Sequence, residues 1–186
     1  MQIISLENIK DIDLSAKVFV YPTETTYGLG GVWDDQNVIE KIYQIKERDE
    51  NKKLPIIADS FETVLKYFEL NPQEKELAAK YWPGALTMVL KKKGSDEKVA
   101  VRVSENETAQ KLASLCGGLI ISTSANISGN KACLSVKEAT KEFENSQFQP
   151  DFIVDGGKLQ PNQPSTIIDV KNGKIEILRQ GKVKIC

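Results

Sequence analysis

The stretch STIIDVKNGKIEILR, residues 165–179, holds two alternating apolar runs on either side of Asn172-Gly173. An Asn-Gly pair between two such runs is a strong signal for a tight β-hairpin, because these residues accept the backbone angles of a two-residue turn. We therefore expect two antiparallel strands in this part of the chain.

Upstream of this hairpin, short β-rich runs alternate with segments of helical periodicity. The expected strands cover residues 17–21, 54–58, 85–91, 99–103, 118–123, 152–155, 165–170 and 174–179. The expected helices cover residues 36–47, 60–68, 72–81, 107–116 and 135–144. This order indicates an α/β (α+β) fold with a mixed-direction sheet and flanking helices, and it leaves the strand order open. No repeat or linker divides residues 1–186, so we expect a single domain.

The composition excludes several kinds of site. The chain has no histidine, which rules out Ser-His-Asp and Cys-His catalysis and histidine metal ligands. Its cysteines, Cys116, Cys133 and Cys186, are widely spaced without a CxxC pair, so we expect no protein-bound zinc. No apolar run approaches the roughly 20 residues that span a bilayer. We expect a cytoplasmic protein without a membrane partner.

Charge alone says little about partners, because 25 Lys and Arg nearly balance 26 Asp and Glu. Four polar segments beside the expected strands are more informative. They are YPTETTYGLGG (21–31), KERDENKKLP (46–55), STSANISG (122–129), and QPSTIID (163–169) with ILRQG (177–181). Hydroxyls, amides and cations in such loops suit an anion or a nucleotide. Each segment alone is also compatible with an ordinary turn or a solvated helix end.

Arg102 stands inside the apolar run VAVRV (99–103). A cation among valines is costly to bury unless it meets an anion. The alternative is an arginine on an edge strand that faces water.

In their order, the motifs PTETTYGLG, KxR, YWPGALTMVL, VAVRV, STSANISG, PSTIID and ILRQG resemble the YrdC-like threonylcarbamoyl-AMP synthase family over residues 17–183. The resemblance implies a twisted mixed-direction sheet around a large cationic cavity, the YrdC/RibB-like fold, in its short single-domain bacterial form. It also implies a nucleotidyltransferase that joins L-threonine, bicarbonate or CO2, and ATP into threonylcarbamoyl-AMP and releases diphosphate. A threonylcarbamoyl transferase complex would then modify tRNA next to the anticodon.

The resemblance also assigns site residues. The catalytic signatures KxR and SxN fall on Lys46, Arg48 and Asn126. The threonine contacts fall on Thr25, Arg102 and Ser122, and the ATP contacts on Arg48, Lys52, Ser124, Ser165, Thr166 and Arg179. Mg²⁺ is expected to arrive with ATP, bound mainly through phosphate oxygens, since no dense carboxylate cluster is visible and we assign no metal ligand to the protein.

Several positions depart from the commoner family pattern. Asp49 and Ser104 stand where proline is usual, and Lys53-Leu54-Pro55 replaces a Pro-Leu pair. Ile57 stands where longer relatives have a histidine, and Ala132 where they often have a serine that contacts ATP.

Three other functions compete with the synthase. The first is a module that binds double-stranded RNA or tRNA directly and assists RNA maturation, against which stand the near-neutral charge and the lack of an aromatic RNA-binding signature. The second is a carbamoyl-transfer domain like that of hydrogenase-maturation proteins, whose fused zinc-finger segment we do not find. The third is a scaffold of the tRNA-modifying complex, which would need no specificity for threonine.

Overall fold

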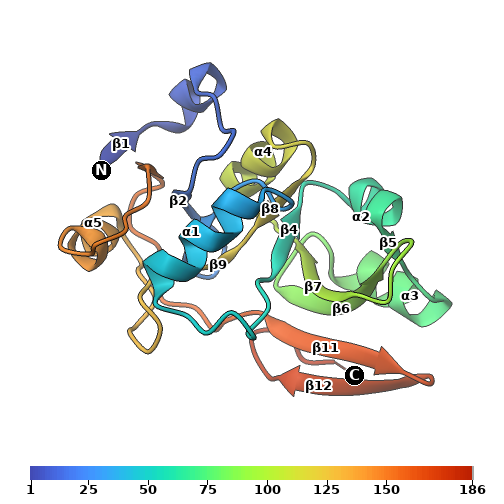
Figure 1. Cartoon of the computed structure of the whole chain (residues 1–186). Helices are drawn as coiled ribbons and strands as arrows, with labels where there is room; N and C mark the ends of the chain where they lie inside the picture. Colours follow the sequence, from blue (N-terminus) through green and yellow to red (C-terminus); the bar gives the residue numbers. More distant parts are fainter. Residues whose placement is uncertain (186) are drawn as a thin grey trace.

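The computed structural model, which describes residues 1–185, arranges the strands in two sheets (Figure 1). The first sheet has the order β1-β10-β2-β3-β9, and the second has the order β12-β11-β6-β7-β4-β8 with β5 beside β6. Both sheets combine parallel and antiparallel neighbours. The expected fold class, a mixed-direction α/β arrangement with flanking helices, is therefore confirmed.

The first sheet contains short strands, most of which are buried. They are β1 (Gln2–Ile4), β2 (Phe19–Pro22), β3 (Tyr27–Gly30), β9 (Thr123–Ser124) and β10 (Phe152–Val154). The second sheet contains β4 (Ile56–Ala58), β5 (Phe68–Glu69), β6 (Leu86–Lys92), β7 (Lys98–Val103), β8 (Leu119–Ile121), β11 (Thr166–Lys171) and β12 (Lys174–Arg179).

Each of the five α-helices within residues 1–185 begins after a residue whose side chain caps the helix start. The helices are the 3₁₀ helix η1 (Leu6–Asp11), α1 (Gln36–Lys46), α2 (Phe61–Tyr67), α3 (Pro72–Tyr81), α4 (Glu107–Leu115) and α5 (Val136–Phe143). Asn71 and Glu74 form a capping box at the start of α3, and the Asn106 side chain accepts two backbone N–H groups at the start of α4. These side chains satisfy donors that a helix start leaves unpaired.

The stretch expected as one strand, residues 118–123, is divided between the two sheets. β8 pairs with β4 in the second sheet, while β9 pairs with β3 in the first, so the chain crosses from one sheet to the other at Ser122. The glycine-rich strand β3 was not predicted, because Gly28 and Gly30 carry none of the β-branched or aromatic signals of a strand. At Gly30 a Cβ would collide with the carbonyl oxygen of Ile121, so a glycine is needed where the sheets approach.

The hairpin predicted from Asn172-Gly173 is confirmed. β11 and β12 are antiparallel, and Asn172 and Gly173 both have positive φ angles, 51° and 72°. The pairing shifts between Ile167 and Ile168, so that Arg179, rather than Leu178, lies opposite Ile167. This irregularity brings Arg179 next to the start of β11.

Gly173→Ala is expected to lower the free energy of unfolding by about 1–2 kcal/mol, because a Cβ is strained at this φ angle. Asn172→Gly is the matched control and is expected to change it by less than about 0.5 kcal/mol, since glycine accepts the same angle. Urea unfolding of the two variants and the wild type measures both effects. Equal stability of the two variants would contradict the turn geometry.

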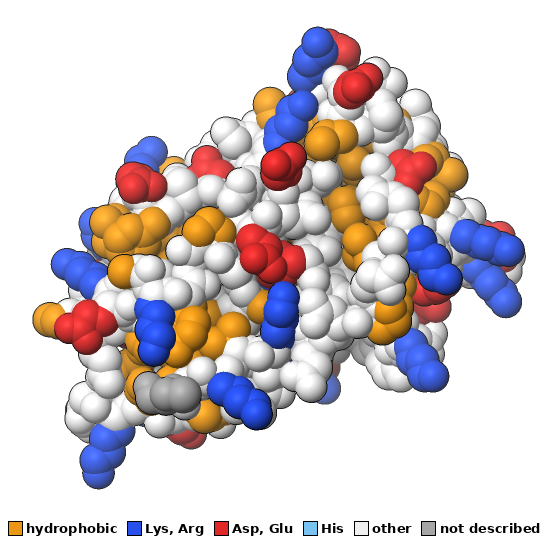
Figure 2. Space-filling view, turned by 180° about the vertical axis from the view of Figure 1, so that it is seen from behind, with side chains coloured by type: hydrophobic (Ala, Val, Ile, Leu, Met, Phe, Trp, Pro, Cys, Tyr) orange, Lys and Arg blue, Asp and Glu red, His pale blue; other side chains and the backbone are white. Residues whose placement is uncertain are grey.

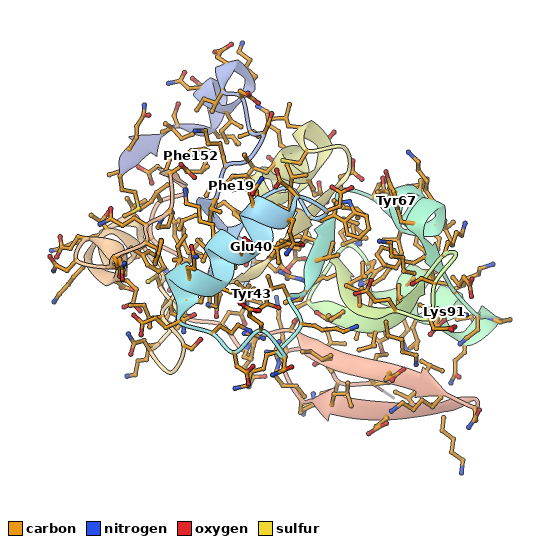
Figure 3. The ribbon with its side chains drawn as sticks, in the orientation of Figure 1. Phe19, Glu40, Tyr43, Tyr67, Lys91 and Phe152 are labelled. Atoms are coloured by element: carbon orange, nitrogen blue, oxygen red, sulfur yellow. The ribbon has the colours of Figure 1, made fainter. Side chains whose placement is uncertain are left out.

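Three apolar cores hold the sheets and helices together. α1 and α5 pack on one face of the first sheet, and α4 and η1 pack near its other face. α2 and α3 pack on the second sheet. The rings of Phe19 on β2 and Phe152 on β10, both labelled in Figure 3, stack with centroids 5.4 Å apart and join these two neighbouring strands of the first sheet.

The surface carries both signs of charge. On the face drawn in Figure 2, Lys and Arg side chains are interspersed with Asp and Glu. Among residues 1–185, no helix has the length and apolar character needed to cross a membrane.

Candidate functional site

A cavity of about 560 Å³ is lined by residues from both sheets. The β2–β3 loop and β9 contribute hydroxyl groups from the first sheet, while β4, β6, β7, β11 and β12 contribute residues from the second. Seven of the residues assigned from the sequence line this cavity: Thr25, Arg48, Arg102, Ser122, Ser124, Ser165 and Arg179. Segments distant in sequence therefore meet at one place.

Four cations, Arg48, Lys53, Arg102 and Arg179, line the cavity, and no Asp or Glu is among the described lining residues. Arg48 follows the end of α1, and its guanidinium donates to the carbonyl oxygens of Lys52 and Lys53 at 3.1 and 3.3 Å. These bonds fix the direction of the side chain. A cavity lined in this way favours anionic groups.

Arg179 is fixed by Ser165, the last residue of the loop of residues 155–165 before β11. Its guanidinium donates to the Ser165 carbonyl oxygen at 2.9 and 3.1 Å and to Ser165 Oγ at 3.0 Å. Ser165 Oγ also lies 2.8 Å from Thr87 Oγ1. Burial lowers the pKa of Arg179 below its usual value. The result is a cation with two neighbouring hydroxyls, an arrangement suited to phosphate oxygens.

Arg102 is buried, not on an exposed edge, so the alternative of an arginine that faces water is wrong. Burial, with a contribution from Arg179, lowers the pKa of Arg102 to about 10. Its guanidinium contacts the carboxylate of Glu24. Glu24 belongs to the hydroxyl-rich loop, where Thr23 Oγ1 donates to the Thr26 carbonyl oxygen at 2.7 Å and holds the turn.

Lys46 and Asn126 lie behind the cavity wall. The Lys46 ammonium is buried and donates to the carbonyl oxygens of Ser124 and Asn126 at 2.6 and 2.8 Å and to Asn126 Oδ1 at 3.3 Å. The Asn126 amide in turn donates to the carbonyl oxygens of Ile127 and Asn130. This network fixes the loop that carries Ser124, so Lys46 and Asn126 position a lining residue and do not line the cavity.

Lys46 is expected to make stability depend on pH in a specific direction. Burial, with repulsion from Arg48, lowers its pKa from 10.5 to about 8. Between these two values the unfolded chain binds more protons than the folded one, so stability rises with pH in this window. Lys46→Met lacks the titratable amino group. The wild type should therefore gain stability relative to this variant between about pH 8 and 10.5 in urea unfolding, and a relative loss would contradict this.

Two further assigned residues do not line the cavity. The Thr166 hydroxyl is buried and donates to the Val183 carbonyl oxygen at 2.6 Å, while it accepts the Gly181 N–H at 3.0 Å. It therefore ties the segment after β12 to β11. The Lys52 side chain is exposed, and its neighbour Lys53 lines the cavity instead.

Sequence reasoning did not single out several residues of the site. Glu24 was quoted only as part of a motif, although a carboxylate in a hydroxyl-rich loop and an arginine among valines are natural partners. Thr87 and Asn162 gave no signal, because a threonine in a core strand and an asparagine in a loop are ordinary. Ile57 and Ala132 line the cavity, so these departures from the family pattern alter its wall.

Cys116 and Cys133 do not line the cavity. Burial raises the pKa of both Cys116 and Cys133 to about 12, which disfavours the reactive thiolate. Among residues 1–185, no group of three or more His, Cys, Asp or Glu side chains is placed to hold a metal ion, and Cys186 lies outside the described residues.

Comparisons with known proteins show which family the chain resembles in sequence and fold. The chain is 36% identical to a threonylcarbamoyl-AMP synthase of Pseudoalteromonas translucida (strain TAC 125) over 170 residues, which cover 86% of this chain and 89% of that protein. Among solved structures, Sua5 of P. abyssi complexed with L-threonine is 32% identical with a TM-score of 0.85, and the match covers 97% of this chain. The match spans 58% of that longer protein.

A second structure, YciO of E. coli, is 25% identical with a TM-score of 0.78, and the match covers 95% of this chain and 86% of that one. The model of the Sua5, YciO and YrdC family, described as "Telomere recombination", matches residues 14–181. These residues include every side chain that lines the cavity. The chain therefore belongs to the Sua5/YciO/YrdC family.

Proposed function

We propose that this protein is a threonylcarbamoyl-AMP synthase, which joins L-threonine, bicarbonate or CO2, and ATP and releases diphosphate. The observation that carries the proposal is the cavity, where Arg48, Arg102 and Arg179 meet serine and threonine hydroxyls, with no carboxylate among the described lining residues. A curated relative of the same name, 36% identical, supports it. The substrates together bring a carboxylate, a bicarbonate and a triphosphate, so their charges must be neutralised before they can be aligned.

In this reaction the threonine amine, as the free base, adds to CO2 with loss of a proton, or to bicarbonate with loss of water. An oxygen of the resulting N-carboxylate then attacks the α-phosphorus of ATP. Diphosphate leaves, and no covalent bond to the enzyme forms. Arg48 and Arg179 neutralise the phosphates, with Ser124 and Ser165 as hydroxyl donors. Arg102, Thr25 and Ser122 hold the amino acid, and the P. abyssi relative, which is complexed with L-threonine, supports threonine as the substrate. Lys46 and Asn126 position the Ser124 loop.

Mg²⁺ enters with ATP, bound to the phosphate oxygens, because the described cavity lining offers no carboxylate ligand. One domain, residues 1–186, carries the activity in the cytoplasm. The product passes to a threonylcarbamoyl transferase complex, which modifies tRNA next to the anticodon.

Direct RNA binding is the alternative, and no specific observation favours it. The charges of both signs in Figure 2 give no continuous basic surface on that face. RNA affinity that falls steeply with salt and does not respond to ATP would support it over the synthase.

Diphosphate release from ATP, Mg²⁺ and bicarbonate tests the synthase, with L-threonine, L-serine or no amino acid added. We expect release with threonine and at least roughly tenfold less with serine, because a buried apolar contact distinguishes the two by one methyl group. Release that does not depend on the amino acid would contradict the proposal, and would favour a scaffold or an RNA-binding role.

A further inference from the structure

A buried ion pair borders the cavity, and the roles described above do not use its acidic member. The carboxylate of Glu24 contacts the guanidinium of Arg102, and the two side chains are 6% and 9% exposed. Ser104 Oγ donates to Glu24 Oε2, and Asn162 Nδ2 donates to the Glu24 carbonyl oxygen at 3.1 Å. Arg102 on β7 and Ser104 directly after it therefore hold the carboxylate, while the loop of residues 155–165 holds the backbone of Glu24.

The Arg102 guanidinium keeps donors for a ligand. It has five N–H donors, and Glu24 is its one carboxylate partner among residues 1–185. No hydrogen bond joins it to another described side chain or carbonyl group, and it lines the cavity. A ligand with a carboxylate can therefore bind Arg102 without displacing Glu24.

The cations of the cavity differ in how they are neutralised. Within the described chain, neither Arg48 nor Arg179 has a carboxylate within 4.0 Å, whereas Arg102 is paired with Glu24. A polyanion such as a triphosphate gains most from the two arginines without a carboxylate partner. A second plain anion at Arg102 would place two negative charges on one guanidinium. A zwitterion would bring an ammonium as well, and it would match the pair with no change in net charge.

We propose that Glu24 is a specificity-determining residue, which makes the Arg102 site selective for a zwitterionic α-amino acid over a simple carboxylate or phosphate. The identity of the amino acid as threonine rests on the proposed function. The preference for a zwitterion rests on the ion pair itself. Glu24 thereby directs the amino acid to Arg102 and leaves Arg48 and Arg179 to the triphosphate.

Calorimetric titration of the full chain tests this selectivity without a catalytic readout. The probes are L-threonine, 2,3-dihydroxybutyrate, which carries a hydroxyl in place of the ammonium, and ATP with Mg²⁺. We expect the wild type to bind threonine at least roughly tenfold more tightly than the hydroxy acid. In Glu24→Gln this preference should disappear, because threonine binds more weakly and the hydroxy acid more tightly, while ATP affinity stays within about twofold.

Glu105→Gln is the matched control. Its carboxylate raises the pKa of Arg102, but its side chain is 49% exposed and pairs with Lys182 at 3.6 Å. We expect this variant to keep the wild-type preference. A preference that persists in Glu24→Gln would overturn the proposal, and so would an equal loss of affinity for all three probes.

Thermal unfolding shows whether Glu24→Gln folds. If this variant does not fold, the titrations of the wild type alone test the proposal. Equal affinity of the wild type for threonine and the hydroxy acid would overturn it. A wild type that prefers threonine but releases no diphosphate would refute the synthase and leave the selectivity of Glu24 standing. Threonine-dependent diphosphate release without a preference for the zwitterion would support the synthase and refute the selectivity of Glu24.

Discussion

Arg48→Ala is expected to reduce threonine-dependent diphosphate release by about 10²–10³-fold, the range found when one donor that stabilises transition-state charge is removed. Arg48 lines the cavity, and the bonds to the carbonyl oxygens of Lys52 and Lys53 aim its guanidinium. Its charge acts on the phosphates when negative charge develops on the leaving diphosphate. The measurement is the initial rate at saturating threonine and bicarbonate with varied ATP.

Lys52→Ala is the matched control, because its backbone carbonyl, and not its exposed side chain, holds Arg48. We expect a rate within about threefold of the wild type, the change that a screened surface charge produces. Thermal unfolding of both variants separates loss of chemistry from loss of fold. Equal loss of activity in Arg48→Ala and Lys52→Ala would show that general charge, and not a directed guanidinium, drives the reaction.

Lys46→Ala is expected to lower the free energy of unfolding by about 3 kcal/mol and to abolish most activity. The ammonium satisfies two carbonyl oxygens and the Asn126 side chain in a buried place. Removing the ammonium leaves these buried acceptors without a donor. Each buried acceptor left unpaired costs about 1–3 kcal/mol of stability. Because the loop carries Ser124 into the cavity, we expect a large rise in KM for ATP as well. Urea unfolding and initial-rate kinetics measure the two effects.

Lys41→Ala is the control on the same helix. Lys41 pairs with Asp151 at 2.7 Å, and its side chain is 31% exposed. The pair is partly buried but still reached by solvent, which screens it, so this variant should lose no more than about 1 kcal/mol and keep its activity. If Lys46→Ala proves no less stable than Lys41→Ala, the buried network does not hold the loop.

The sequence predicted the longer elements of the fold because their local signals agree with their tertiary context. The Asn172-Gly173 hairpin and the caps at Asn71 and Asn106 are formed by neighbours in the chain. The division into two sheets was not predictable, because it depends on contacts between distant segments. At Ser122 the chain leaves one sheet for the other, and β3 is a strand only because its glycines fit between larger neighbours.

The same distinction applies to the site. The motifs predicted which segments meet, but not which side chain of each segment faces the cavity. Lys46 and Arg48 are two residues apart, yet α1 ends at Lys46, and Glu47 after it turns the chain with a φ angle of 48°. One cation is therefore buried under the Ser124 loop and the other lines the cavity. The choice between Lys52 and Lys53 likewise depends on a loop conformation that no local pattern specifies.

The most direct test of the synthase is mass spectrometry of the product formed from ¹³C-bicarbonate, ATP, Mg²⁺ and L-threonine. We predict threonylcarbamoyl-AMP that carries the ¹³C label, formed by the wild type and not by Arg48→Ala. AMP or diphosphate without a labelled product, or an adenylate formed equally well without threonine, would contradict the account.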